Sequence, residues 1–206
     1  MSEEIKVEPL KFTKELQGIS KRQISEHHDV LYAGYVRKTN EIRSKLKAAD
    51  LAEANPTFSL IRELKLEESF AINGVKLHEG YFDHLGGDGV PSGSILDLIK
   101  EDFGSFEGWE REFKALGIAS RGWVILAYDW DDGKLHNYLC DFHNQGGVWS
   151  CTSLLILDVY EHAYFLDYAT ARKSYIEAFM KNVDWTFVNS LIEKHGILEH
   201  RKRQRA

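Results

Sequence analysis

The chain has 206 residues, of which 43% are apolar and 28% are charged, and its formal net charge is −6. This composition is typical of a globular protein with one large domain or two small adjoining domains, and it excludes an intrinsically disordered chain. The acidic body argues against a nucleic-acid partner, and we expect the short basic run at residues 201–205 to be a solvated end.

The chain has no apolar run that approaches the roughly 18 residues needed to cross a membrane. Its acidic N-terminus lacks the apolar centre of a signal peptide. The two cysteines, Cys140 and Cys151, are too few for the disulfide framework of a small secreted protein. We therefore expect a cytoplasmic protein that has no membrane partner.

The first part of the chain has a helical pattern. Residues 1–18 look irregular, and from Ser20, a residue type suited to a helix N-cap, apolar residues recur at helical spacing. Asn55–Pro56 interrupts this pattern, residues 58–85 favour one or two further helices, and a glycine cluster follows. These features predict an N-terminal helical hairpin domain over residues 1–86.

The second part of the chain changes from helical to strand periodicity and back. Three strands separated by turns follow two helices at 95–101 and 106–120, and the strands are expected at 122–130, 135–142 and 153–157. Residues 160–195 are again helical and amphipathic. The order predicts an α+β fold, with a C-terminal domain over residues 94–206 that consists of a three-stranded antiparallel sheet surrounded by helices.

Two potential metal ligands follow the third predicted strand. Asp158 ends this strand, and His162 comes where the next helix begins, so both side chains can point into one cavity. A carboxylate and a neutral imidazole suit a first-row transition metal. Two ligands hold a metal poorly, and His27, His28 and His78 on predicted helices are the candidates for the others. Taken singly, a helical histidine or a D-x-x-x-H spacing is more often structural.

The ordered set of motifs along the chain resembles the iron/manganese superoxide dismutase family. The family signature, an aspartate, an aromatic position and then Glu-His-Ala-Tyr, reads D-V-Y-E-H-A-Y at residues 158–164. The resemblance covers nearly the whole chain, and the other matching positions are His27–His28, Tyr35–Val36, Gly122–Trp123, Asn144–Gln145, Tyr168, Arg172 and Tyr175.

The resemblance implies a redox enzyme that converts superoxide to dioxygen and hydrogen peroxide. It implies one manganese or iron ion per subunit, with four ligands: His27, His78, Asp158 and His162. Gly74 together with a glutamine at position 145 is similar to the manganese type, whereas the short loop before Asp158 is similar to the iron type.

The resemblance also assigns residues around the ion. Tyr35 is expected at the substrate gateway, Trp123 in the pocket wall, and Gln145 as the hydrogen-bond partner of the metal-bound solvent. His143 is the alternative to Gln145, because the loop is shorter than in many relatives. Arg172 is expected to attract superoxide to an otherwise acidic protein.

Further positions bear on the pocket and on assembly. Tyr160 and Phe82 replace two pocket tryptophans of the family. Glu161 is implied to reach across a subunit interface to a metal-ligand histidine of the partner, which predicts a homodimer or a dimer of dimers. Leu31 and Phe165 replace a histidine and a tyrosine that meet across this interface, which implies a repacked apolar contact.

Three alternatives remain open from the sequence. The replacements at Leu31, Phe165 and Tyr160 are compatible with a homologue that binds metal or dimerises without catalysis. Two histidines and a carboxylate also occur in mononuclear iron oxygenases, although a fourth protein ligand would crowd the open face that these enzymes need. Cys140, His143 and Cys151 offer three zinc ligands, where a structural zinc site normally takes four.

Overall fold

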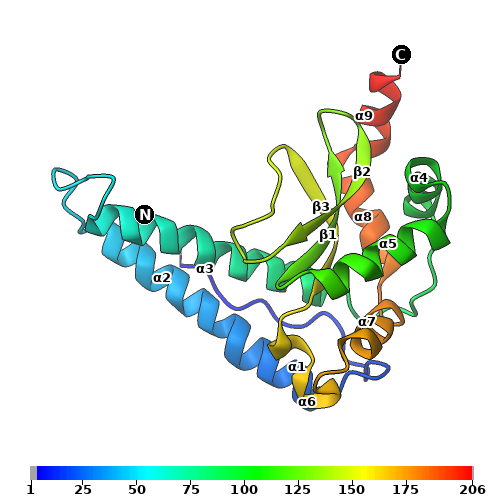
Figure 1. The fold of residues 1–206 in the computed structure, drawn as a ribbon, viewed down its shortest axis with the longest axis horizontal. Helices are drawn as coiled ribbons and strands as arrows, with labels where there is room; N and C mark the ends of the chain where they lie inside the picture. Colours follow the sequence, from blue (N-terminus) through cyan, green and yellow to red (C-terminus); the bar gives the residue numbers. More distant parts are fainter. Residues whose placement is uncertain (1–3, 206) are drawn as a thin grey trace.

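The computed structural model describes residues 4–205, and its N-terminal half is a long helical hairpin (Figure 1). The first arm consists of three consecutive helical segments: α1 (Lys21–Ser25), the π-helix η1 (Glu26–Tyr32) and α2 (Ala33–Leu46). The second arm is a single helix, α3 (Leu60–Asp83). The Ser20 side chain accepts a hydrogen bond from the amide of Gln23, which confirms the expected N-cap.

A three-stranded antiparallel sheet forms the centre of the C-terminal half. The strands β1 (Trp123–Asp129), β2 (Lys134–Cys140) and β3 (Cys151–Asp158) lie in the order β2-β1-β3. The central strand β1 is buried along almost its whole length, and it pairs Trp123 with Cys140 on one side and with Asp158 on the other. This register brings the end of β3 beside the start of β1, and it confirms the predicted α+β fold.

Helices surround the sheet, as expected (Figure 1). Helix α3 of the hairpin packs against β3, while α4, α5 and α8 pack against the three strands. The helical elements of this half are α4 (Ser94–Phe103), α5 (Phe106–Ala119), the 3-10 helix η2 (Glu161–Ala163), α6 (Phe165–Tyr168), α7 (Arg172–Met180), α8 (Trp185–His195) and α9 (Ile197–Gln204). None of the helices within residues 4–205 has the length and apolar character that a membrane crossing requires.

One large hydrophobic core extends through both halves. It includes Ile24 and Val75 from the hairpin together with Trp123, Leu157 and Tyr175 from the sheet and its helices. Residues 84–93 connect α3 to α4, and the amides of Gly87 and Gly89 bond to backbone carbonyls near the end of α7. The boundary between domains at 1–86 and 94–206 stays a prediction.

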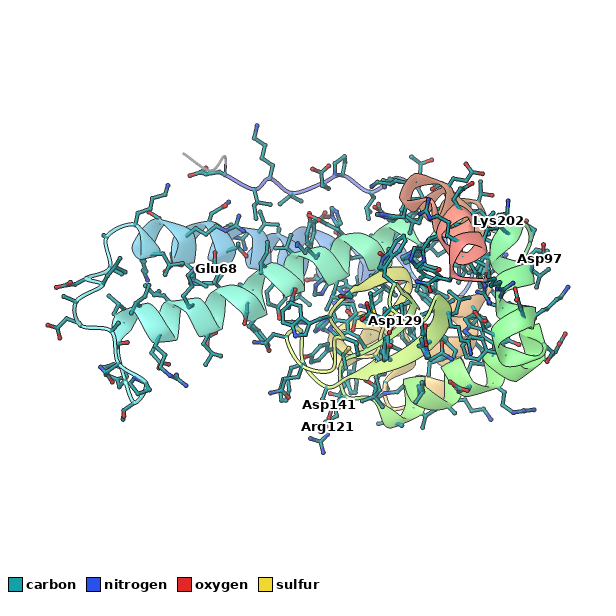
Figure 2. All side chains as sticks on the ribbon, turned by 90° about the horizontal axis from the view of Figure 1, so that it is seen from above. Glu68, Asp97, Arg121, Asp129, Asp141 and Lys202 are labelled. Carbon is teal, nitrogen blue, oxygen red and sulfur yellow. The ribbon has the colours of Figure 1, made fainter. Side chains whose placement is uncertain are left out.

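The C-terminal basic run differs from the expectation of a solvated end. Residues Ile197–Gln204 form α9, which packs against α8, and in Figure 2 Lys202 on this helix lies near Asp97 of α4. Arg201 is only 4% exposed, and its guanidinium forms a two-pronged ion pair with Asp102. The prediction was wrong for Arg201, because a buried carboxylate on α4 offers this side chain a partner.

Candidate metal centre

Four side chains from distant parts of the chain converge beside the start of β1. His27 comes from η1, His78 from α3, Asp158 from the last position of β3, and His162 from η2. One potential ligand atom of each lies within 4.8 Å of the others. The structure therefore brings together all four residues that the sequence singled out as metal ligands.

The ligand atoms are arranged around Asp158 Oδ2. This oxygen lies 3.1 Å from His27 Nε2, 3.2 Å from His162 Nε2 and 3.6 Å from His78 Nε2. The Nε2 atoms of His78 and His162 are 3.4 Å apart. Ligands that each lie about 2.1 Å from a shared ion are separated by roughly 3.0–3.6 Å in tetrahedral or trigonal-bipyramidal geometry. These four separations fall in the range that a single bound ion imposes.

The protonation of these groups also suits a metal. Burial lowers the pKa of His27 and, more strongly, that of His78, so both rings are neutral near pH 7. His78 donates from Nδ1 to the carbonyl of Gly74 over 2.6 Å, which leaves the lone pair of Nε2 facing the cluster. Burial opposes ionisation of Asp158, but its histidine neighbours, His162 first, lower the pKa of this carboxyl below its usual value. Neutral imidazoles and one carboxylate form a ligand set for iron or manganese.

The π-helix separates the roles of two adjacent histidines. His27 points into the cluster, whereas His28 Nε2 bonds to the carbonyl of Glu8 over 2.9 Å and fixes the N-terminal segment. Extra residues in a helical turn change where side chains point, and π-helical turns are frequent at functional sites. This geometry distinguishes His27 from His28, which the sequence pattern alone did not.

Local hydrogen bonds fix Asp158 at the end of its strand. The amide of Tyr160 bonds to Asp158 Oδ1 at 2.9 Å, and the hydroxyl of Tyr175 donates to the Asp158 carbonyl at 2.7 Å. The second carboxylate oxygen, Oδ2, is therefore left to face the histidines. Tyr175, which the resemblance matched without assigning a role, supports the backbone at this ligand.

Aromatic rings enclose the cluster at the expected positions. Trp123 meets the His78 ring edge-on at 5.0 Å between centroids, Tyr160 stacks on His162 at 5.2 Å, and Phe82 lies 4.9 Å from His27. The sequence reasoning did not include Tyr32 and Tyr81, whose rings also lie beside His78 and His27. Their only sequence signal is an aromatic residue on the same helical segment as a ligand. Three of the four ligand residues, His27, His78 and Asp158, are 0% exposed.

Trp123, His143 and Tyr35 form a chain of hydrogen bonds next to the cluster. Trp123 Nε1 donates to His143 Nδ1 over 3.0 Å, so the proton of this neutral imidazole resides on Nε2. His143 Nε2 then donates to the hydroxyl oxygen of Tyr35 over 2.7 Å. Burial lowers the pKa of His143 to about 4, which keeps the ring neutral near pH 7.

The structure does not bring Gln145 into this arrangement. Gln145 is exposed, because the loop after β2 turns back on itself at this point. The backbone amide of Gln145 donates a hydrogen bond to the carbonyl of Phe142. His143, at 5% exposure, occupies the inner position instead. Of the two residues that the sequence proposed beside the metal-bound solvent, His143 is the one that lies at the site.

Gly74 allows the ring of Tyr35 to approach the backbone of α3 closely, which the sequence did not predict. A side chain at this position would place its first carbon 2.8 Å from the ring of Tyr35, which is too close for an ordinary contact. Glycine therefore allows α2 and α3 to bring Tyr35 against His78, whose ring lies 5.3 Å away. The same residue accepts the hydrogen bond that orients His78.

The remaining predicted residues do not belong to the four-ligand group. Arg172 donates to the hydroxyl of Tyr164 over 3.0 Å and to the carbonyl of Ser120 over 2.7 Å. Glu161 is exposed and immediately precedes His162. Within residues 4–205, Cys140, His143 and Cys151 do not form a group that could hold a metal.

Comparison with known proteins gives a consistent result. Residues 91–191 match the family model for the C-terminal domain of iron/manganese superoxide dismutases. A protein of Aquifex aeolicus named superoxide dismutase (Fe) is 45% identical, with 87% of this chain and 86% of that protein aligned. A superoxide dismutase (Fe) of Cupriavidus metallidurans is 41% identical over 86% of this chain and 88% of its own length. A superoxide dismutase (Mn) of Haloarcula marismortui is 38% identical over 81% of this chain and 82% of its own length. The chain therefore belongs to the iron/manganese superoxide dismutase family.

Proposed function

We propose that the chain is a superoxide dismutase, which converts two superoxide anions and two protons into dioxygen and hydrogen peroxide. The single observation that carries this proposal is the convergence of three imidazole nitrogens and one carboxylate oxygen in a buried site of a member of this family. Relatives with more than 40% identity carry the same activity in their names.

One iron or manganese ion per subunit is the proposed cofactor, and His27, His78, Asp158 and His162 are its proposed ligands. When bound, this ion would supply the one-electron redox chemistry of both halves of the reaction. The relatives include proteins named for iron and proteins named for manganese, so the proposal covers both metals.

His143 and Tyr35 are the proposed proton-handling residues of this chain. Because His143 donates to the Tyr35 oxygen, the hydroxyl proton of Tyr35 is free to point toward solvent or substrate at the cluster. Burial raises the pKa of Tyr35, so the hydroxyl keeps its proton near pH 7. We assign to His143 the position beside metal-bound solvent that the resemblance offered to Gln145 or His143.

Arg172 remains the proposed residue that attracts superoxide. A net charge of −6 repels a small anion, so a local positive charge has to compensate near the site. The partners of the guanidinium are a hydroxyl and backbone carbonyls, all of them neutral. The hydrogen bonds therefore fix the position of this charge without cancelling it.

We further propose that the enzyme is a cytoplasmic antioxidant protein that assembles as a homodimer or a dimer of dimers. Leu31 and Phe165 are 36% and 46% exposed in the single chain, and both are apolar. A partner subunit at this face would cover them and bring its Glu161 to His162, whose side chain is 24% exposed.

Reconstitution with iron or manganese, followed by measurement of superoxide decay after pulsed generation, tests the function. We expect decay well above the spontaneous rate, and loss of both metal and activity in His78→Ala. His195→Ala is the control, because this exposed histidine lies on α8. Full metal occupancy with decay at the spontaneous rate would contradict the enzymatic proposal. Metal and activity retained in His78→Ala would contradict the ligand set.

A further inference from the structure

A second group of potential metal ligands lies at the turn between β1 and β2. One ligand atom each from Asp129, Asp132 and His136 lies within 4.8 Å of the others. Trp123, beside the redox site, begins β1, and Asp129 ends it, so the two groups are separated by about 20 Å of strand. Figure 2 marks Asp129 on the sheet.

The register of the hairpin creates this group. Asp129 pairs with Lys134, and Ala127 pairs with His136, so His136 lies diagonally across from Asp129 on the same face of the sheet. Asp132 lies in the turn. Gly133 closes this turn with φ 69°, and its backbone amide donates a hydrogen bond of 3.0 Å to the carbonyl of Asp129.

Backbone amides orient both carboxylates. Asp129 Oδ1 accepts from the amide of Asp131 over 2.8 Å, and Asp132 Oδ1 accepts from the amide of Lys134 over 2.9 Å. Asp129 Oδ2 accepts one long hydrogen bond of 3.4 Å from the hydroxyl of Tyr138, and its other lone pair can still coordinate a cation. Asp132 Oδ2 lies 2.8 Å from His136 Nε2, so the imidazole nitrogen already faces a carboxylate oxygen.

We propose that Asp129, Asp132 and His136 bind a divalent first-row transition-metal cation such as zinc, with water completing its coordination. Two carboxylates offset the charge of a dication, and an imidazole ligand favours zinc over calcium or magnesium, which prefer oxygen ligands alone. The side chains of Asp132 and His136 are 46% and 38% exposed, so the cation has direct access from solvent.

Cys151 lies outside the proposed ligand set, although it pairs with Asp129 in the sheet. Its sulfur lies 3.8 Å from the hydroxyl of Tyr138, and burial raises the pKa of this thiol, which disfavours the thiolate that zinc needs. A cation at the three ligands would connect the last residue of β1 through the turn to β2. Because the site exists only in the folded hairpin, bound cation would stabilise the fold.

Zinc titration of the iron-loaded enzyme tests this proposal. We expect calorimetry and metal analysis after dialysis to show one zinc per subunit in addition to the iron. His136→Asn and Asp132→Asn should each weaken zinc binding by at least about tenfold, since even residues behind the ligands contribute that much at other metal sites. Asparagine at 132 keeps an acceptor for the Lys134 amide, so the turn is preserved.

His195→Asn and Cys151→Ser are the matched controls, and both should bind zinc as the unchanged protein does. Iron content and dismutase activity should stay constant in all four variants, because none of these positions lies in the redox site. The proposal is overturned if no additional zinc binds, if zinc uptake equals iron loss, or if His136→Asn binds zinc with unchanged affinity.

Discussion

At the scale of single residues, both ring nitrogens of His143 form hydrogen bonds to other side chains. Trp123 donates to one nitrogen, and the other donates to Tyr35, so this ring fixes the orientation of the Tyr35 hydroxyl. We expect His143→Ala to lower the turnover of the metal-loaded enzyme by at least about tenfold, as loss of a residue behind a metal site commonly does. Steady-state kinetics at equal metal content measures the effect.

Gln145→Ala provides the comparison for this prediction. Gln145 is exposed on the same loop, and the substitution should leave turnover within about twofold of the unchanged enzyme. The reverse result, with a larger loss in Gln145→Ala than in His143→Ala, would return the role to Gln145 and contradict our assignment.

Outside the redox site, the protonation of His84 affects the pH dependence of the free energy of unfolding. Burial lowers its pKa to about 4, whereas a histidine in an unfolded chain titrates near 6.5. The unfolded chain therefore takes up the proton first as the pH falls. The stabilising contribution is complete above pH 6.5 and is lost progressively toward pH 4, which amounts to about 2 kcal/mol between pH 7 and pH 5.

His84→Leu should remove this part of the pH dependence. The ring packs against Phe187 at 5.2 Å, so an apolar side chain suits the surroundings. Chemical unfolding at pH 7 and pH 5, at one protein concentration, should show a smaller difference in unfolding free energy for the variant. Equal differences in the two proteins would mean that other groups cause the loss of stability in acid.

Individual residues differ in how far their positions followed from sequence. Asp158 and His162 lie only four residues apart, so a strand end and the next helical turn were enough to place them together. His143 and Gln145 lie on an irregular loop, where no periodicity decides which side chain points inward. That choice depends on the hydrogen bonds to Trp123 and Tyr35, which belong to distant segments.

At the scale of whole elements, a buried ion pair joins α9 to α4. Arg201 and Asp102 are each 5% exposed at the side chain, and Asp102 also accepts a bond of 2.9 Å from the amide of Leu135. Composition alone made residues 201–205 resemble a solvated basic tail. The partner carboxylate lies about a hundred residues earlier in the chain, so local reasoning could not identify it.

We expect Arg201→Ala to lower the free energy of unfolding by about 3–5 kcal/mol, because it leaves the Asp102 carboxylate buried without its counter-charge. Arg203→Ala removes the same charge from an exposed position of α9 and should change stability by less than about 0.5 kcal/mol. Denaturant unfolding of both variants makes the comparison. Similar losses in the two would show that the ion pair does not anchor the helix.

At the scale of the whole molecule, the two segments next to the redox site carry exposed apolar side chains. Val30 and Leu31 on η1 and Phe165 and Leu166 on α6 are between 36% and 52% exposed. Isolated exposed apolar residues are ordinary, but four of them on the segments that carry His27 and follow His162 favour a subunit interface. This interface is the part of the proposed assembly that substitutions can test directly.

Phe165→Glu should convert the proposed dimer into monomers at micromolar concentration, since the substitution places a charge in an apolar contact. Sedimentation velocity measures the change. Trp149→Glu is the matched control, because Trp149 is 94% exposed on the loop before β3 and its substitution should leave the dimer intact.

If Leu31 of one subunit meets Phe165 of the other, adding Leu31→Lys to Phe165→Glu should restore association by pairing opposite charges. A dimer that persists in Phe165→Glu alone would place the interface elsewhere on the molecule.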